Sequence, residues 1–183
     1  GAYRGLGWID FEARKCWTGL EVSGNYVRGL AGFAMNGNGK TLIDATFSNN
    51  DIQTIPDRQY RSAYPYFINW YSVRDVKNFV CENNTLNTGY SVMPSRYAVD
   101  GCIFRNNHIT GGDILFLHGL YGDIIIDNNI KDNRSEILMT DDNLYLPSYL
   151  SEDEEKHCNF IFTNNNGGIK SGSNKESLLY KPS

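Results

Sequence analysis

The chain has 183 residues, which is enough for one domain with a sizeable buried core but tight for two. Its 17 basic and 21 acidic residues give a net charge of −4, which provides no electrostatic basis for binding nucleic acid or an anionic membrane. No apolar run approaches the ~20 residues of a membrane span, and no signal peptide opens the sequence. Four cysteines without a CxxC pair indicate neither a disulfide scaffold nor a zinc site.

Asparagine is the unusual component of the chain, with 21 residues beside 18 glycines and only 5 prolines. Asparagine and glycine both tolerate left-handed backbone and are typical of tight turns. Because 40% of the chain is nevertheless apolar, the composition excludes disorder, and it also disfavours a helical bundle. It predicts many short strands joined by tight turns.

One short motif recurs six times along the chain. It consists of an apolar residue, a polar residue, an Asn-rich pair, one further residue and an aliphatic residue. The copies span 22–27, 47–52, 81–86, 104–109, 126–130 (one residue shorter) and 162–167. Their first positions are separated by 25, 34, 23, 22 and 36 residues, so a base period of 22–25 with two insertions explains all of them.

The segments around these motifs alternate between apolar and polar residues, as strands with one buried face do. The residue two places before each motif is usually apolar. Each repeat also contains a further strand-like segment, which we count as its first strand. These first strands span 8–12, 32–36, 67–71, 90–94, 113–117 and 136–140, and we call their outward side the first-strand face. Three short strands per repeat without an intervening helix predict a solenoid of stacked coils.

An asparagine at the same turn of every coil can adopt a positive φ at low cost, and stacked amides hydrogen-bond along the column. We expect such a column from Asn25, Asn50, Asn84, Asn107 and Asn165. Here the sequence resembles the right-handed parallel β-helix proteins of the pectate-lyase type over roughly residues 8–169. A β-propeller or sandwich would require three columns to agree by coincidence.

The expected fold class is therefore all-β: a right-handed parallel β-helix of about six to seven coils with an Asn ladder. We expect one domain over 1–183, cut from a longer β-helix, with a seventh coil beginning at 177–180. Cys81 and Cys102 fall in inward columns two residues out of register, and we expect them to be buried free thiols.

Two interruptions of the repeat, at 53–65 and 141–158, are expected to flank the first-strand face from opposite sides. The first is rich in Arg and Tyr, with Arg58, Tyr60, Arg61 and Tyr64. The second is acidic, with Asp141, Asp142 and the run 152–155. They would form two walls with the first-strand face as the floor.

The first-strand face carries more apolar residues than a solvated surface normally does. Aromatic rings at Phe67, Tyr71 and Tyr90 would offer stacking platforms for sugars, with Arg58, Tyr60, Arg96 and His118 nearby to bind hydroxyl and acid groups. The aliphatic residues Val92, Leu115, Leu117 and Leu138 would serve equally well as a glycan-binding surface or as a face buried against a neighbouring subunit or under the chain's own loops.

Asp113 and Glu136 are the candidate catalytic residues, since they occupy one outward column on adjacent coils, ~4.8 Å apart at the backbone. Like charges this close raise one pKa, which keeps a general acid protonated near neutral pH. Asp141 is the alternate carboxylate. A pair of carboxyl groups favours a glycoside hydrolase over a lyase. The alternative is that Asp113 and Glu136 are an exposed acidic pair with no catalytic role.

A lyase would need a basic residue, and only Arg58, Arg61 and Arg96 are expected near this face. No calcium-ligand cluster, other metal site or cofactor site is indicated. The chain also resembles phage tailspikes, which are trimers of right-handed β-helices that bind and often cleave surface polysaccharide. The resemblance implies a polysaccharide ligand, a homotrimer or adjoining β-helix segments as partners, and an extracellular or virion location. The alternative is a non-catalytic structural or adhesin segment whose apolar face is an oligomer interface.

Overall fold

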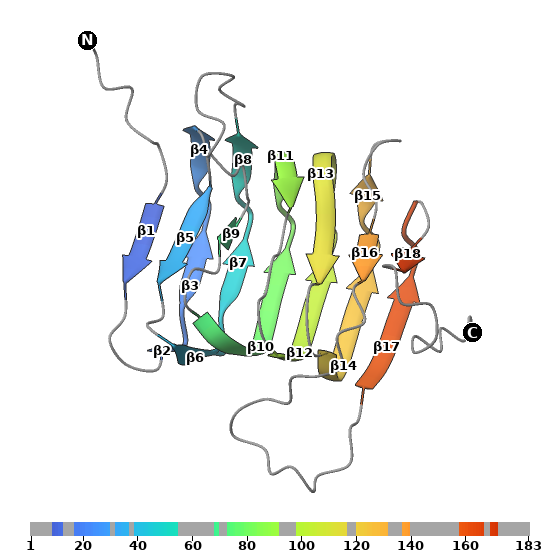
Figure 1. Ribbon diagram of the computed structural model, residues 1–183. Helices are drawn as coiled ribbons and strands as arrows, with labels where there is room; N and C mark the ends of the chain where they lie inside the picture. The colour runs from blue at the N-terminus through green and yellow to red at the C-terminus, as the bar shows by residue number, and fades with distance from the viewer. Residues whose placement is uncertain are drawn as a thin grey trace, which may run out of the picture.

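A computed structural model describes residues 9–12, 17–29, 32–36, 39–54, 68–69, 73–91, 98–116, 120–131, 137–139, 158–166 and 169–171. These residues form strands, turns and bends and contain no helix. All the strand pairs among them are parallel (Figure 1). The all-β class with parallel sheets is therefore confirmed.

The strands form three sheets. The short sheet has the order β1 (Ile9–Glu12), β5 (Phe33–Asn36), β9 (Ile68–Asn69). The eight-stranded sheet runs β17 (Cys158–Thr163), β14 (Leu120–Asp127), β12 (Ala98–Arg105), β10 (Val73–Glu82), β6 (Lys40–Ile43), β2 (Trp17–Thr18), with β7 (Thr46–Ser48) and β3 (Glu21–Ser23) continuing beside β10. The seven-stranded sheet runs β18 (Ile169–Ser171), β16 (Ile137–Met139), β13 (His108–Phe116), β11 (Thr85–Ser91), β8 (Asp51–Thr54), β4 (Tyr26–Gly29), with β15 (Ile130–Lys131) also on β13.

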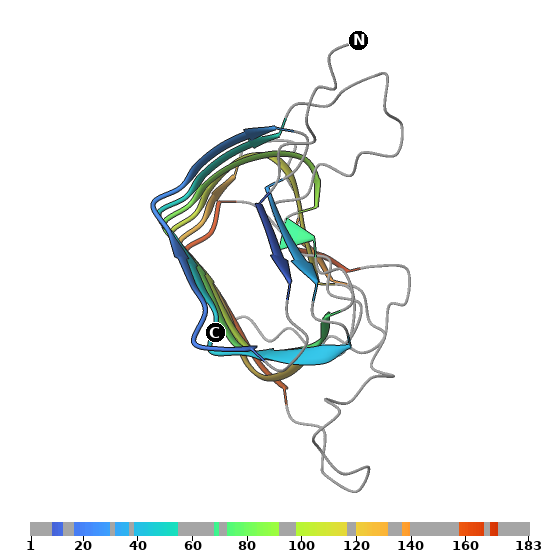
Figure 2. The ribbon, with the colours of Figure 1, turned by 90° about the vertical axis from the view of Figure 1, so that its left-hand side faces the viewer.

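Each pass of the chain lies against the previous pass. The motif residues Val22, Phe47 and Cys81 are successive partners in neighbouring strands, and Cys81 continues to Phe104 and Ile126. In the view of Figure 2 the strands of successive passes lie one behind another, and the eight-stranded and seven-stranded sheets meet at a bend. The repeat therefore sets the register of the sheets.

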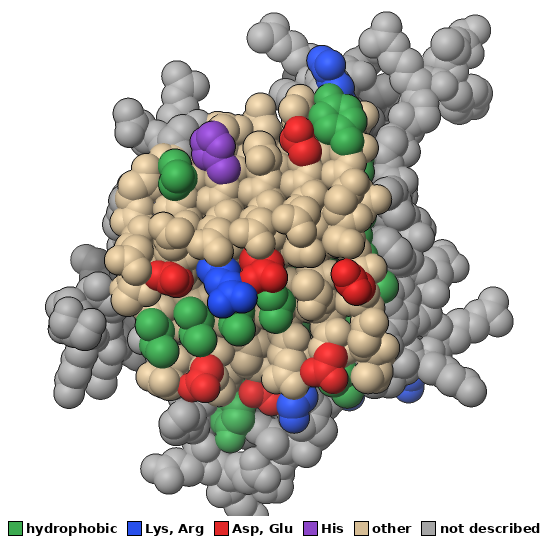
Figure 3. All heavy atoms as spheres, turned by 180° about the vertical axis from the view of Figure 1, so that it is seen from behind, with side chains coloured by type: hydrophobic (Ala, Val, Ile, Leu, Met, Phe, Trp, Pro, Cys, Tyr) green, Lys and Arg blue, Asp and Glu red, His purple; other side chains and the backbone are tan. Residues whose placement is uncertain are grey.

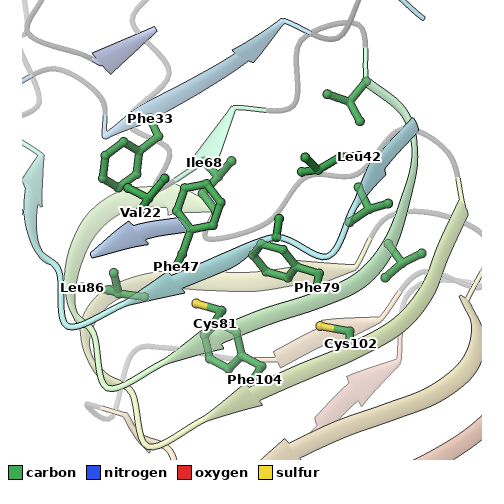
Figure 4. Close-up of a cluster of buried hydrophobic side chains, with 14 of the residues drawn as sticks. Val22, Phe33, Leu42, Phe47, Ile68, Phe79, Cys81, Leu86, Cys102 and Phe104 are labelled. Atoms are coloured by element: carbon green, nitrogen blue, oxygen red, sulfur yellow. The ribbon is translucent and has the colours of Figure 1, made fainter. Parts of the chain in front are cut away.

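The core lies between the sheets and is built from the inward residues of this register. Phe33, Phe47, Phe79 and Phe104 are completely buried (Figure 4). Phe47 packs edge-on against Phe33 and at a tilt against Phe79, with ring centroids 5.4 Å and 5.7 Å apart. The predicted alternation of buried and outward residues is confirmed along 78–82 of β10, 101–105 of β12 and 123–127 of β14, whereas Phe47 and Ser48 of β7 are both buried.

The Asn ladder is also confirmed, and it includes Asn129. Each side-chain Nδ2 donates to the Oδ1 of the next asparagine along the column at 2.8–3.0 Å, in the order Asn25, Asn50, Asn84, Asn107, Asn129, Asn165. The backbone N–H of each of the first five also donates to the same oxygen at 2.9–3.1 Å. Every Oδ1 from Asn50 to Asn165 thus accepts at least two hydrogen bonds, and that of Asn107 accepts a third from Cys81 Sγ at 3.9 Å.

The positive φ, however, belongs to the residue before the ladder asparagine, contrary to expectation. In five turns this residue is Asn49, Asn83, Asn106, Asn128 or Asn164, with φ of 51–56°, and in the first turn it is Gly24 with φ of 68°. The two positions have different tasks: the first reverses the chain in left-handed backbone, and the second points its amide into the stack. This explains why the motif carries a pair of asparagines.

One copy of the motif was aligned wrongly by sequence. The stretch 126–130 was expected to be one residue shorter, with Ile130 in the buried aliphatic position. The register instead pairs Lys131 with Ile109, and Ile130 with His108. Lys131 is therefore 4% exposed and Ile130 is 57% exposed. In the five described turns from Asn25 to Asn129, the next strand begins at the residue directly after the ladder asparagine, whatever residue stands there.

A second column of left-handed residues bends each pass within the eight-stranded sheet: Gly19, Asp44, Asn78, Gly101 and Gly122. At Gly122 (φ 69°), a Cβ would stand 2.7 Å from Asp100 Oδ1 and 3.3 Å from the backbone nitrogen of Gly101. At Gly24 (φ 68°), a Cβ would meet nothing within 4 Å.

Gly122→Ala is therefore expected to lower the free energy of unfolding by about 2–3 kcal/mol, and Gly24→Ala by about 1 kcal/mol. Both variants place a Cβ on left-handed backbone, and only the first also forces Asp100 aside. Urea unfolding of the two variants and the parent checks this difference. Equal losses would show that Asp100 moves without cost.

Candidate functional site

Two of the predicted site residues lie in described strands: Tyr90 in β11 and Asp113 in β13. The others lie outside the described residues, namely Arg58, Tyr60, Phe67, Tyr71, Arg96, His118, Glu136 and Asp141. The predicted walls are described only at their ends. Gln53 and Thr54 belong to β8 and Cys158 to β17, so these three residues are strand residues rather than loop residues.

The backbone register beside Asp113 differs from the expected one. Asp113 pairs with Ser91, not with Tyr90. Between the pairs Asn87–Gly111 and Ser91–Asp113, β11 advances four residues and β13 only two. The additional residues of β11 must bulge from the ladder, and the Gly111-Gly112 dipeptide gives β13 freedom to accept this. Tyr90 and Asp113 are thus one residue out of the common column that the sequence predicted.

Directly after Asp113 the predicted register is confirmed. Ile114 pairs with Ile137 and Leu115 with Leu138. The stack continues into β18, where Ile137 pairs with Ile169 and Leu138 with Lys170. Three neighbouring strands are therefore in register immediately beyond the candidate acid.

Lys170 is a basic residue of this stack that sequence reasoning missed. Only arginines were expected near the first-strand face, and the next coil was expected at 177–180, which lies outside the described residues. The signal was present, because two glycines at 167–168 precede the short apolar-polar alternation of Ile169–Ser171. A two-glycine turn followed by such an alternation indicates a strand.

The outer face of the eight-stranded sheet carries paired charges. Arg105 Nε lies 2.7 Å from Glu82 Oε2, and Lys77 Nζ lies 3.8 Å from Asp100 Oδ2. The Thr163 hydroxyl donates to Asp127 Oδ1 at 2.6 Å and thereby holds the pKa of this carboxyl below its usual value. Asn164 donates to the same oxygen at 3.0 Å and, with the Arg105 charge, acts in the same direction. Asp127 is therefore ionised at neutral pH.

Cys81 and Cys102 are free and buried, as expected. Burial raises the pKa of the Cys102 thiol to about 12. Burial, followed by the neighbouring Cys102, raises the pKa of the Cys81 thiol well above its usual value. Asn84 Nδ2 also donates to Cys81 Sγ at 3.3 Å. A protonated thiol is a poor nucleophile, so these two residues serve the core rather than chemistry.

Within the described ranges, no group of three or more His, Cys, Asp or Glu side chains could hold a metal ion. The same residues include no helix that is long and apolar enough to cross a membrane. No protein-family model matches the chain, and neither the curated proteins nor the solved structures contain a match.

Proposed function

We propose that the chain is a right-handed parallel β-helix of the pectate-lyase type, of about six to seven coils, that binds polysaccharide along its first-strand face. The parallel pairing of all described strands and the continuous Asn ladder support the fold. We place its activity outside the cell or on a phage tail, where surface polysaccharide is the substrate.

The observation that carries the functional proposal is the in-register stack of β13, β16 and β18 directly beyond Asp113. In such a stack, equivalent positions repeat every ~4.8 Å along a straight line, so the surface has the linear, repeating character of a polysaccharide. Lys170 adds a positive charge to the strand stack and would favour an acidic sugar.

For the cleavage step we propose Asp113 and Glu136, with Asp141 as the alternate. One carboxylic acid protonates the glycosidic oxygen, and the other carboxylate attacks the anomeric carbon or activates water. Adjacent strands would hold the two carboxyl groups near the ~5–5.5 Å separation of retaining hydrolases. The proposed sugar contacts are Phe67, Tyr71, Tyr90, Arg58, Tyr60, Arg96 and His118.

The test is an activity assay on a panel of bacterial capsular polysaccharides and lipopolysaccharides, in which turnover is measured as the release of reducing ends. Asp113→Asn and Glu136→Gln are each expected to lower kcat about 100-fold or more while leaving glycan binding nearly unchanged. Asp123→Asn is the matched control, because Asp123 is an exposed carboxylate of the eight-stranded sheet. Near-normal activity in both site variants would reject the acid pair, and an unsaturated product would identify a lyase.

The second candidate is a non-catalytic structural segment that forms a homotrimer through an apolar face. The observation in its favour is the register of Leu115 with Leu138, which puts two aliphatic residues side by side in the stack. Glycan binding distinguishes the candidates, because a trimer is compatible with both. Under this second proposal the chain binds no glycan on the polysaccharide panel, light scattering shows a trimer, and Leu138→Lys converts the trimer to monomers.

A further inference from the structure

A row of aliphatic residues crosses the outer face of the eight-stranded sheet. Val80 pairs with Ile103, Ile103 with Ile125, and Ile125 with Ile161, so the four residues occupy one position on the neighbouring strands β10, β12, β14 and β17. Figure 3 shows this row of hydrophobic side chains across the face. We call Val80, Ile103, Ile125 and Ile161 the aliphatic row.

The aliphatic row faces outward. The residues on either side of Ile103 along β12, Cys102 and Phe104, are buried in the core, so the alternation of the strand directs Ile103 away from it. Ile161 is 37% exposed, and the other three side chains are half-buried. Earlier passes have Glu21 and Thr46 at this position, so the fold itself does not require an aliphatic residue here.

Charged side chains border the aliphatic row on both sides (Figure 3). Glu82, Arg105 and Asp127 follow its members by two residues on three strands, and Lys77, Asp100 and Asp123 precede them. With Asp44 and Glu21, the described side chains around the row comprise six acids and two bases. Because the acids outnumber the bases, the net charge of this border is negative. Both bases are already engaged in ion pairs, Arg105 with Glu82 and Lys77 with Asp100.

We propose that the aliphatic row is a docking surface for a basic amphipathic helix of a partner protein. Four rows of strand span about 14 Å, which matches two to three turns of helix. Apolar side chains repeat about every 5.4 Å along one helix face, close to the ~4.8 Å repeat of the row. Lys and Arg on both sides of that face would meet the acidic border.

The geometry disfavours other occupants. The row lies on the face of a sheet and runs across its strands, so an added β-strand would find no free backbone edge there. Two copies of this face would bring one negative border against another. An anionic membrane surface would be repelled in the same way.

The probe is a synthetic helical peptide of about 14 residues with Leu along one face and Lys on both flanks of it. Its fluorescence anisotropy is measured against the full chain. Ile103→Lys is expected to weaken binding about 10-fold or more, because it buries a like charge against the peptide. Ile130→Lys is the matched control, since Ile130 is a more exposed isoleucine on β15, outside the row.

A second variant keeps the proposal testable if Ile103→Lys does not fold. Asp123→Lys changes an exposed border residue, with the loss of one surface hydrogen bond from Asn159, and is also expected to weaken binding. Raising the salt concentration from about 0.05 to about 0.5 M should also weaken binding of the peptide to the parent chain, because salt screens the attraction between the lysines and the acidic border.

Equal binding by the parent chain, Ile103→Lys and Asp123→Lys would overturn the proposal, as would equal binding of a peptide with the same composition in scrambled order. Self-association of the chain that Ile103→Lys abolishes would also overturn it and would identify a second copy as the occupant. Loss of sugar binding has no bearing on this test, because the row and the first-strand face lie on different sheets.

Discussion

Asn107→Ala is expected to lower the free energy of unfolding by about 4 kcal/mol, because it opens the ladder at a buried position. The Asn107 Oδ1 accepts from the backbone and side-chain nitrogens of Asn84, both at 3.0 Å. Its Nδ2 donates to the Cys81 carbonyl and to Asn129 Oδ1, also at 3.0 Å. Truncation therefore leaves buried groups of three neighbours short of a partner, at roughly 1–3 kcal/mol each.

The adjacent asparagine supplies the control. Asn106 is exposed and has a φ of 53°, and its Oδ1 accepts one surface hydrogen bond from Asn128. Asn106→Gly should change the stability by less than about 0.5 kcal/mol, because glycine adopts left-handed backbone freely. Urea unfolding followed by circular dichroism measures both variants. Similar losses in the two would contradict the prediction and would show that the ladder hydrogen bonds of Asn107 add nothing to the stability of the turn.

Phe47→Ala should cost about 3–5 kcal/mol. The Phe47 ring is completely buried between Phe33 and Phe79, so its removal leaves a cavity that the rigid stack of strands can close only in part. Phe47→Leu retains much of the volume and should cost about 1.5 kcal/mol. Thermal and urea unfolding provide the measurement.

Tyr26→Ala is the reference for this series, since the side chain is 62% exposed and should change the stability by less than about 0.5 kcal/mol. A Phe47→Ala loss no larger than that of Tyr26→Ala would mean that the core is not packed around this ring.

The sequence was most informative where one residue type has one structural task. The asparagines repeat because each ladder position needs both a donor and an acceptor in a buried turn, so the column from Asn25 to Asn165 could be predicted. The buried thiols were predictable for a similar reason, because Cys81 and Cys102 occupy inward positions of an alternating pattern.

Prediction failed where the local pattern and the register disagreed. Ile130 looked like the buried aliphatic residue of its motif, but the fixed distance from Asn129 places Lys131 there instead. Tyr90 looked like the partner of Asp113, but β11 holds more residues than β13 between two paired positions. A bulge leaves no mark in apolar periodicity, so a sequence alignment of strands misses it.

The candidate site was harder to predict than the fold. Its residues come from segments far apart in the chain. Several of them lie in the insertions, which are not part of the repeat, so the repeat cannot predict where these residues lie. Asp113 lies in a strand, but that strand begins at His108 and not at Asp113 as expected, and the role of the carboxylate stays a prediction. Lys170 was overlooked because its strand is only three residues long.

The ladder amides all point in one direction, so the stack has a polarity. Each Nδ2 from Asn25 to Asn129 donates to the following pass, and each Oδ1 from Asn50 to Asn165 accepts from the preceding one. The amide dipoles add head to tail, and each bond polarises the next. An added pass of strands that carries its own ladder asparagine is therefore expected to keep this alignment, whereas a pass without one would divide the dipole chain in two.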